Sequence, residues 1–293
     1  MRRSLPSRMI GRLRERPGAR APRLTTQSQA PGEVEKRAPI FIVGCQRSGT
    51  SLLRRILDSH PNIACPPESK FILPMTEVLR DRRSLSGLDS MGFDGREVRL
   101  ALANFVGGFF DQYAAVQGKS RWADKTPNYV DCLDEIWELF ESSARFIVLV
   151  RHGMDVAFSL SDPHRKYPAI KDHVERHAGN IAVAGAHFWR EQNEKIETFR
   201  NAHSSACFRI RYENVTSTPE VTLPQLFEFL EEPWIREVID YSSFSHHAGY
   251  EDPDVRRRRR IEPNSGRYLT WPDAKQREVR EACEPVLTKL GYE

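Results

Sequence analysis

The chain has 293 residues, 39% of them hydrophobic and 29% charged, which is the composition of a soluble globular protein with a substantial core. It contains no run of about 18 apolar residues, so the sequence predicts neither a membrane span nor a secretory signal segment. The five cysteines form no C-x-x-C pair, which argues against a metal site and a disulfide scaffold and favours a reducing compartment.

Positive charge is concentrated at the start of the sequence. Residues 1–39 carry a net charge of +7, from ten Lys and Arg against three Asp and Glu, whereas the remaining residues carry a net charge of −3. We therefore expect residues 1–37 to form a basic, disordered arm, with an Arg-rich transit peptide as the alternative, and residues 38–293 to form the folded domain. A second basic run, RRRRR at 256–260, indicates a nucleic-acid surface or a mobile loop near an anionic ligand. Because no aromatic residues are interleaved with it, we expect no nucleic-acid partner.

The predicted elements alternate between strands and helices along the chain. Apolar runs indicate buried strands at 38–44 and 145–150, and the alternating pattern of 207–215 indicates a half-buried strand. Residues 121–127 suit a short strand followed by a loop. Helical periodicity predicts helices in six segments, which are 50–59, 99–116, 129–140, 171–200, 219–232 and 273–290. This alternation predicts an α/β fold with a mostly parallel central sheet, helices on both faces, and ligands beyond the carboxyl ends of the strands.

The segment GCQRSGTS at 44–51 joins the first predicted strand to the first predicted helix. Its spacing, Gly44-x4-Gly49, matches a phosphate-binding loop, in which backbone N–H groups at a helix N-terminus attract an oxyanion. Thr50 stands where an ATP-binding loop carries Lys, and Arg151 rather than a metal-binding Asp follows the second apolar strand. The sequence therefore predicts a P-loop-like fold that binds a phosphate-linked oxyanion without a metal ion. A Gly-containing turn without a ligand is the alternative.

Two segments resemble the nucleotide motifs of sulfotransferases that use 3′-phosphoadenosine 5′-phosphosulfate (PAPS), above all the branch of tyrosylprotein and bacterial sulfotransferases. FIVGCQRSGTSLLRRILDSHPNI is similar to their 5′-phosphosulfate loop, near Gly-x-Pro-Arg-Ser-Gly-Thr-Thr, with Gln46 in place of Pro and Ser51 in place of the second Thr. RFIVLVRHGMDVAFSL is similar to their 3′-phosphate segment, with Gly153 in place of the usual Pro. In this second segment we expect Asp155 to be the N-cap of the following helix.

Two further segments extend the resemblance, so that it covers roughly residues 38–290. RYENVTSTPEVTLPQLFEFLEEPW is similar to the Tyr-Glu-Asp-Leu segment of the family, and NSGRYLTW is similar to its late loop over the nucleotide. The resemblance implies that PAPS is the co-substrate and that no metal ion takes part. It also implies a set of PAPS-binding residues, which are Arg47, Ser48, Gly49, Thr50, Ser51, Arg151, Ser159, Tyr212, Ser265 and Arg267.

The catalytic residues are predicted from two more resemblances. CPPESKF at 65–71 is similar to the segment that supplies the catalytic Glu of tyrosylprotein-type enzymes, which implies that Glu68 is the general base. WADKTPNY at 122–129 resembles the family's Lys-[Thr/Asp/Ser]-Pro segment, which implies that Lys125 donates to the bridging oxygen or the sulfuryl group. Arg47 is expected to share this electrostatic role.

These patterns predict a sulfotransferase that moves the sulfuryl group of PAPS to a hydroxyl acceptor. The sequence does not distinguish among small molecules, carbohydrates, lipids and peptidyl tyrosine as the hydroxyl acceptor. We expect residues 72–120 and 160–200 to line the acceptor site. Because the sequence lacks the N-terminal membrane anchor of Golgi tyrosylprotein enzymes, we expect a cytoplasmic enzyme. The sequence is compatible with either a monomer or a homodimer. The rival interpretations are a P-loop-type small-molecule kinase and a non-catalytic module that binds a nucleotide or polyanion.

Overall fold

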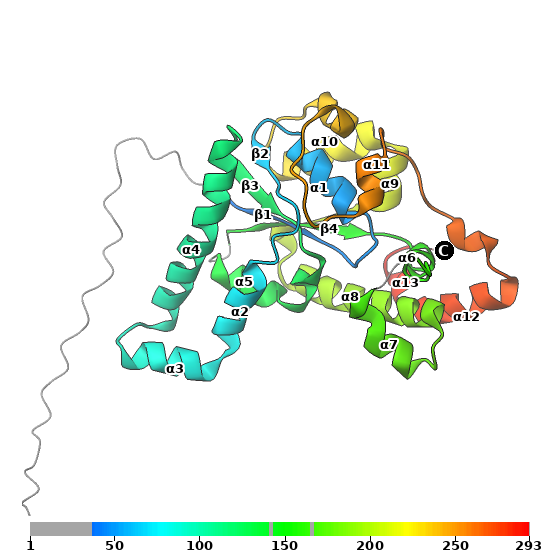
Figure 1. Ribbon diagram of the computed structural model, residues 1–293, viewed down its shortest axis with the longest axis horizontal. Helices are drawn as coiled ribbons and strands as arrows, with labels where there is room; N and C mark the ends of the chain where they lie inside the picture. Colours follow the sequence, from blue (N-terminus) through cyan, green and yellow to red (C-terminus); the bar gives the residue numbers. More distant parts are fainter. Residues whose placement is uncertain (1–36, 141–142, 165–166, 293) are drawn as a thin grey trace, which may run out of the picture.

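A parallel sheet of five strands forms the centre of the computed structural model, which describes residues 37–140, 143–164 and 167–292 (Figure 1). The strands are β1 (Ile40–Val43), β2 (Ile63–Ala64), β3 (Arg121–Asp124), β4 (Arg145–Val150) and β5 (Cys207–Arg211). Their order is β2-β3-β1-β4-β5, and all four neighbouring pairs are parallel. This arrangement confirms the predicted parallel sheet. Residues 1–36, which make up almost all of the predicted arm, lie outside the described residues.

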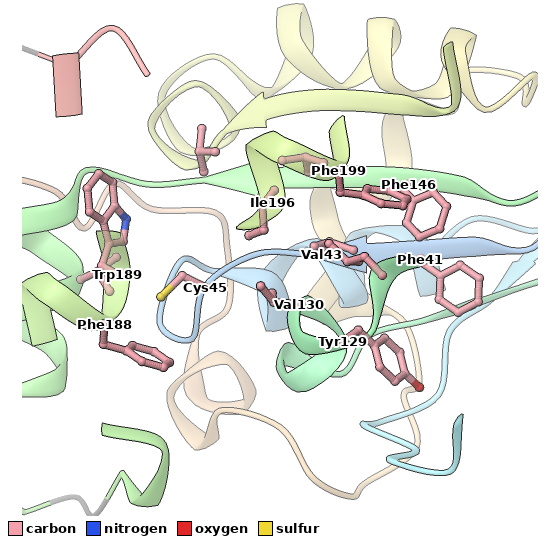
Figure 2. Packing of buried hydrophobic residues seen from close by; sticks show 14 of the residues in the cluster. Phe41, Val43, Cys45, Tyr129, Val130, Phe146, Phe188, Trp189, Ile196 and Phe199 are labelled. Carbon is pink, nitrogen blue, oxygen red and sulfur yellow. The ribbon is translucent and has the colours of Figure 1, made fainter. Parts of the chain in front are cut away.

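Helices cover both faces of the sheet, as predicted (Figure 1). Side chains alternate along β1, so that Ile40 and Ile42 pack on one face with α1 (Thr50–Asp58), α9 (Tyr212–Ser217) and α10 (Pro219–Phe229). Phe41 and Val43 pack on the other face with α6 (Gly153–Leu160) and α8 (Ile181–Ala202). Figure 2 shows the second cluster, in which the ring of Phe146 lies 5.5 Å from that of Phe41. Such apolar burial on both faces is the main source of stability in an α/β domain.

The remaining helices lie around these two layers. The α-helices are α2 (Ile72–Arg80), α3 (Arg82–Ser90), α4 (Gly95–Val116), α5 (Leu133–Leu139), α7 (Lys171–Arg176), α11 (Pro253–Arg257), α12 (Asp273–Cys283) and α13 (Val286–Lys289). Short 3₁₀ turns span Pro127–Asp131, Pro168–Ile170, Ser204–Ala206, Arg236–Ser243 and Arg267–Thr270. The helices α2, α3 and α11 and the strand β2 were not predicted from the sequence.

Five predicted elements end or break earlier than expected. The predicted helix 129–140 is a 3₁₀ turn followed by α5, because Cys132 between them has non-helical backbone angles, and the predicted helix 219–232 ends at Phe229. The predicted helix 171–200 is two helices, because Ala178 and Gly179 adopt left-handed φ angles of 50° and 83° between α7 and α8. The predicted strand 207–215 ends at Arg211, where α9 begins, so its last residues are helical. The predicted helix 273–290 is interrupted before α13, where Pro285 has no backbone N–H to continue the ladder.

The sheet brings three predicted site segments to one edge. The loop 44–51 follows β1, Lys125 follows β3, and Arg151 follows β4. Because β1 pairs in parallel with both β3 and β4, the carboxyl ends of the three strands lie next to one another. The fold therefore gathers residues that are more than a hundred positions apart in the sequence at the edge where open α/β sheets bind ligands.

Candidate functional site

The loop after β1 leads into the N-terminus of α1. Gly49 is the N-cap residue of α1 and has a left-handed φ of 97°. A Cβ atom at Gly49 would lie 2.4 Å from Cδ2 of Tyr212, so the ring of Tyr212 packs directly against the loop backbone. Ser48, Thr50 and Ser51 are buried. This geometry places backbone N–H groups and hydroxyls at the positive end of a helix, which is an arrangement that suits an oxyanion.

A cavity of about 470 Å³ lies beside this loop. Eight of the ten predicted PAPS-binding residues line it, and they are Arg47, Gly49, Thr50, Ser51, Arg151, Ser159, Tyr212 and Arg267. Of the other two, Ser48 is buried in the loop, and Ser265 is exposed and does not line the cavity. The two motif segments that sequence analysis assigned to opposite ends of one nucleotide therefore line a single cavity.

Arg151 is a buried cation on the wall of this cavity. One of its terminal nitrogens donates to the backbone oxygen of Arg47 at 2.9 Å, and the other donates to the backbone oxygen of Asn264. Its guanidinium carbon lies 4.4 Å from the centre of the Tyr212 ring. Burial lowers the pKa of Arg151, because removal of water disfavours its charged form.

Two buried polar atoms at this site have no hydrogen-bond partner among the described residues, and they are Nε of Arg151 and Oγ of Ser48. Buried polar groups in proteins are almost always hydrogen-bonded, so each such atom needs an explanation. One donor belongs to the phosphate-type loop and the other to the segment after β4. An anionic ligand with two separate anionic groups would fit these two donors.

Arg47 contacts two other residues that line the cavity. Its Nε donates to Oγ of Ser159 at 2.8 Å, and a terminal nitrogen lies 2.8 Å from a carboxylate oxygen of Asp252. The backbone of Arg47 adopts a left-handed φ of 70°, which turns the loop sharply just before α1. One guanidinium therefore bonds a residue of α6 and a residue just before α11 at once.

Asp155 does not cap α6, contrary to the prediction from sequence. His152 is the N-cap, and its Nδ1 accepts the backbone N–H of Met154 at 3.3 Å. Asp155 lies in the first turn of α6, and its carboxylate accepts the backbone N–H groups of Gly266 and Arg267 at 2.9 and 3.0 Å. The carboxylate thus ties the late loop to α6, a long-range contact that no local pattern reveals.

A second cavity, of about 490 Å³, contains Glu68. It shares Arg47, Thr50, Ser51 and Asp252 with the first cavity, so the two cavities meet at the loop. A carboxylate oxygen of Glu68 lies 2.6 Å from Nζ of Lys125, and that nitrogen lies 3.4 Å from Oγ of Ser51. The side chain of Lys125 is buried. The predicted base, the predicted cation and the loop therefore form one chain of contacts.

The walls of this second cavity differ from the expected acceptor segments. Among the described residues, none from 72–120 lines it, and Tyr167 is its contribution from the segment 160–200. Residues 249–253 line it instead. The backbone oxygen of Tyr250 accepts the N–H of Glu68 at 3.0 Å, and the N–H of Asp252 donates to Ser51 at 3.3 Å. The Gly, Asp and Pro residues of 249–253 indicate a turn, but nothing in the sequence indicates where it folds.

The first cavity also has lining residues that sequence analysis did not assign. Phe158 and Trp271 form an aromatic pair with ring centres 5.3 Å apart. Arg258 and Arg260 come from the basic run 256–260, which places part of that run beside the loop. Six Lys and Arg residues line the cavity against four Asp and Glu residues, so the lining favours an anionic ligand.

Within the described part of the chain, no cluster of three or more His, Cys, Asp or Glu side chains could hold a metal ion. Among the same residues, no helix combines the length and apolar character needed to cross a membrane.

Comparison with known proteins identifies the family. A profile of the sulfotransferase family matches residues 39–236, and the chain belongs to this family. The protein-tyrosine sulfotransferase of Drosophila melanogaster is 25% identical over 227 residues, which cover 75% of this chain and 44% of that protein. The nodulation protein NoeE of Sinorhizobium fredii is 36% identical over 127 residues, which cover 41% of this chain and 30% of that protein. The chain spans less than half of the length of these relatives.

A solved structure supports the fold. The sulfotransferase domain from the curacin biosynthetic pathway superposes with a TM-score of 0.61 at 21% identity. The superposition covers 88% of this chain and 98% of that domain. At this level of identity the likeness establishes the shared α/β fold.

Proposed function

We propose that this protein transfers the sulfuryl group of PAPS to a hydroxyl acceptor. One observation supports the proposal above all others. The loop 44–51 and the residues Arg151 and Ser159 line a single cavity, and the Glu68–Lys125 pair reaches the same loop from the adjoining cavity. A donor bound in the first cavity would then face an acceptor bound in the second.

The donor would bind through both ends of its nucleotide. The hydroxyls and N–H groups of residues 48–51 would hold the 5′-phosphosulfate, and Arg151 with Ser159 would hold the 3′-phosphate. The unpartnered Nε of Arg151 and Oγ of Ser48 support this assignment, because each would gain an oxyanion as partner. Phe158 and Trp271 offer an aromatic surface for adenine. Ser265 faces solvent, so its contribution would require the late loop to move.

In the transfer step, the acceptor oxygen would attack the sulfur atom while the bond between sulfur and the bridging phosphate oxygen breaks. The acceptor proton would pass to Glu68, and the released nucleotide would be adenosine 3′,5′-bisphosphate. Negative charge grows on the bridging and sulfuryl oxygens, where Lys125 and Arg47 would stabilise it. Lys125 pairs with Glu68 in the structure, so donor binding would draw the ammonium group away and leave the carboxylate able to accept a proton.

Binding of the nucleotide product gives the first test. We expect calorimetry to detect binding of adenosine 3′,5′-bisphosphate, and to detect weaker or no binding of ATP with Mg²⁺, since the loop lacks its Lys. Arg151→Ala should weaken bisphosphate binding about 10- to 100-fold, because a charge-assisted hydrogen bond contributes about 1.5–3 kcal/mol. Arg236→Ala is the matched control, because Arg236 is an exposed arginine that pairs with Glu220 at 3.4 Å. Preferential binding of ATP with Mg²⁺ would instead support the kinase interpretation.

Transfer of ³⁵S from labelled PAPS to a panel of acceptors gives the second test. A tyrosyl peptide should be tried first because of the similarity to protein-tyrosine sulfotransferases, followed by carbohydrates, lipids and small phenols. Glu68→Gln should lower kcat about 10²- to 10⁴-fold, the usual contribution of a general base, and should leave bisphosphate binding unchanged. Glu138→Gln, an exposed carboxylate on α5, is the control. Equal turnover by Glu68→Gln and the wild-type chain would exclude Glu68 as the base.

A further inference from the structure

Two short segments, 68–70 and 124–126, contact each other at and next to the Glu68–Lys125 ion pair. Oγ of Ser69 donates to a carboxylate oxygen of Asp124 at 2.7 Å. The backbone N–H of the next residue along, Lys70, donates to Oγ1 of Thr126 at 3.3 Å. The residues 68–70 and 124–126 therefore make three successive contacts, of which the ion pair itself is the first. The loop that carries the candidate base is thus connected to the end of β3, which carries the candidate cation.

Asp124 is the centre of these contacts. Its side chain is fully buried and accepts three hydrogen bonds, from Ser69, from the hydroxyl of Tyr129, and from the backbone N–H of Lys125 at 2.9 Å. The ring of Tyr129 packs in the core with its centre 6.0 Å from that of Phe41, so its hydroxyl is held in place. A buried carboxylate is unfavourable unless it is hydrogen-bonded, and three donors meet that requirement.

Asp124 lines neither cavity, so it contacts neither donor nor acceptor from this position. Its hydrogen bonds reach instead the residue after Glu68 and the backbone of Lys125. The segment between β2 and α2 that holds Glu68 has no regular secondary structure, and its other backbone tie at Glu68 is the 3.0 Å bond to Tyr250. The position of the base therefore depends on a few specific contacts, of which Asp124 accepts one.

We propose that Asp124, held by Ser69 and Tyr129, is a positioning residue that fixes the Glu68 carboxylate relative to the Lys125 ammonium group. This inference rests on the proposed function. During transfer, Lys125 has to leave Glu68 for the oxygens of the donor while both backbones stay in place. Asp124 makes this exchange a movement of side chains alone, because it bonds both the side chain of Ser69, next to Glu68, and the backbone N–H of Lys125. A displacement of about 1 Å at a reacting group lowers the rate of an enzyme about 100-fold, so such a constraint has a measurable effect.

Ser69→Ala is the most direct test, because it removes the connection to Asp124 without changing a charge. We expect kcat for ³⁵S transfer to fall about tenfold or more, whereas KM for PAPS and the Kd of adenosine 3′,5′-bisphosphate should stay within about twofold. Ser69→Thr keeps the hydroxyl and should restore much of kcat. Ser143→Ala is the matched control, since Ser143 is exposed and its hydroxyl donates to the nearby backbone oxygen of Phe140.

Hydrogen exchange gives a readout that does not depend on activity. Amides of residues 68–71 should exchange faster in Ser69→Ala and in Tyr129→Phe than in the wild-type chain, while those of α8 should not change. Tyr129→Phe keeps the ring in the core, so it serves as a second variant with intact packing.

The outcomes separate the two proposals. A kcat within about twofold of wild type in Ser69→Ala would overturn the positioning role, and so would a parallel loss of kcat and nucleotide affinity, which would indicate general disruption. If the wild-type chain transferred no sulfuryl group to any acceptor, the proposed function would fail. In that case faster exchange at residues 68–71 would still support the role of Asp124 in holding the loop, and unchanged exchange would overturn it.

Discussion

Arg47 lies where the two cavities meet, and its surroundings show how a single side chain can serve both. Its guanidinium bonds Ser159 and pairs with Asp252, and its carbon lies 5.9 Å from the centre of the Tyr167 ring. Ser159 belongs to the candidate donor site, whereas Tyr167 belongs to the wall of the candidate acceptor site. A group transferred from one cavity to the other would pass this guanidinium. Because Arg47 pairs with Asp252, a donor bound as proposed would have to compete with this carboxylate for the guanidinium.

Asp252→Asn should therefore strengthen donor binding. The substitution removes the charge that pairs with Arg47 at 2.8 Å and that would repel a phosphosulfate in the same place. Both side chains are 18% exposed, so the pair is partly screened by solvent. We expect KM for PAPS to fall about two- to fivefold, which corresponds to about 0.4–1 kcal/mol. Steady-state kinetics with ³⁵S-labelled PAPS would measure this change in KM.

The control for this prediction is Asp240→Asn, an exposed carboxylate in the 3₁₀ turn Arg236–Ser243. This variant should behave as the wild-type chain does. An increase in KM for PAPS in Asp252→Asn would show that the carboxylate orients Arg47 for the donor instead of competing with it.

At the scale of elements, sequence patterns predicted those strands and helices whose formation depends on neighbouring residues in the sequence. The apolar runs predicted β1 and β4, because strands buried on both faces of a parallel sheet need continuous hydrophobic residues. The strand, loop and helix around Gly49 followed from the apolar run, the Gly44-x4-Gly49 spacing and the helical periodicity. Parallel pairing then placed the loop beside Arg151, which the alternation of strands and helices implied. The part of the candidate donor site that belongs to the loop was predictable for this reason, whereas Ser159, Tyr212 and Arg267 were assigned from the resemblance to the sulfotransferase family.

Features that depend on long-range contacts were not predictable from these patterns. Residues 249–253 line the candidate acceptor cavity because Tyr250 and Asp252 bond Glu68 and Ser51, which lie about 200 positions away. Asp155 has the residue type of an N-cap, but it lies in the first turn of α6, and its carboxylate accepts hydrogen bonds from the late loop. Helical periodicity continued through the turn between α7 and α8, where backbone angles, not side-chain patterning, end the helix.

The junction between β1 and α1 should tolerate no side chain at Gly49. An alanine there would need a left-handed backbone, and its Cβ would lie 2.4 Å from the ring of Tyr212. We expect Gly49→Ala to lower the free energy of unfolding by about 1–3 kcal/mol and to weaken adenosine 3′,5′-bisphosphate binding. Urea unfolding and calorimetry would measure the two effects.

Gly107→Ala is the matched control, because Gly107 lies inside α4 with nothing within 4 Å of an added Cβ. This variant should raise the free energy of unfolding by about 0.5–1 kcal/mol, since alanine loses less backbone entropy than glycine in a helix. Equal effects of the two substitutions would show that the packing of Tyr212 against the loop is unimportant.

At the scale of the whole molecule, a buried ion cluster connects the segment 249–257 to the first helix, α1. Glu251 is fully buried at its side chain and pairs with Arg54 and Arg55 of α1 at 3.3 and 2.8 Å. It also bonds Arg256 of α11 at 2.8 Å. Arg55 and Glu251 are 196 positions apart, so this cluster holds the segment 249–253 over the loop. Three residues of this segment's neighbourhood, Arg54, Arg55 and Arg256, thus hold a wall of the candidate acceptor cavity through Glu251.

Glu251→Gln should destabilise the protein in a pH-dependent way. Burial alone would raise the pKa of Glu251, but the hydrogen bonds and charges of Arg55, Arg256 and Arg54 outweigh it, and the pKa is lowered from its ordinary value of 4.5. A carboxylate with a lowered folded pKa stabilises the folded state above its unfolded pKa, and this stabilisation is lost as pH falls through the folded pKa. Burial raises the pKa of Asp124, so its protonation favours the folded state as the pH falls, which is the opposite effect. This contribution is present in both the wild-type chain and Glu251→Gln, so it cancels in the comparison between them.

We expect the substitution to lower the free energy of unfolding by about 3 kcal/mol near pH 7, because it leaves buried arginines without their counter-charge. The difference from wild type should begin to shrink as the pH falls below the ordinary carboxylate value of 4.5, because the unfolded wild-type chain then takes up a proton at Glu251 that the folded chain, with its lowered pKa, does not. The difference should be smallest once the pH lies below the folded pKa as well, where Glu251 is neutral in both states. Urea unfolding at about pH 7, 5 and 3.5 would measure this difference. The exposed carboxylate of Glu281, replaced by Gln, should show no such trend. A difference that stays constant across this pH range would mean that Glu251 stabilises the chain by packing and not by its charge.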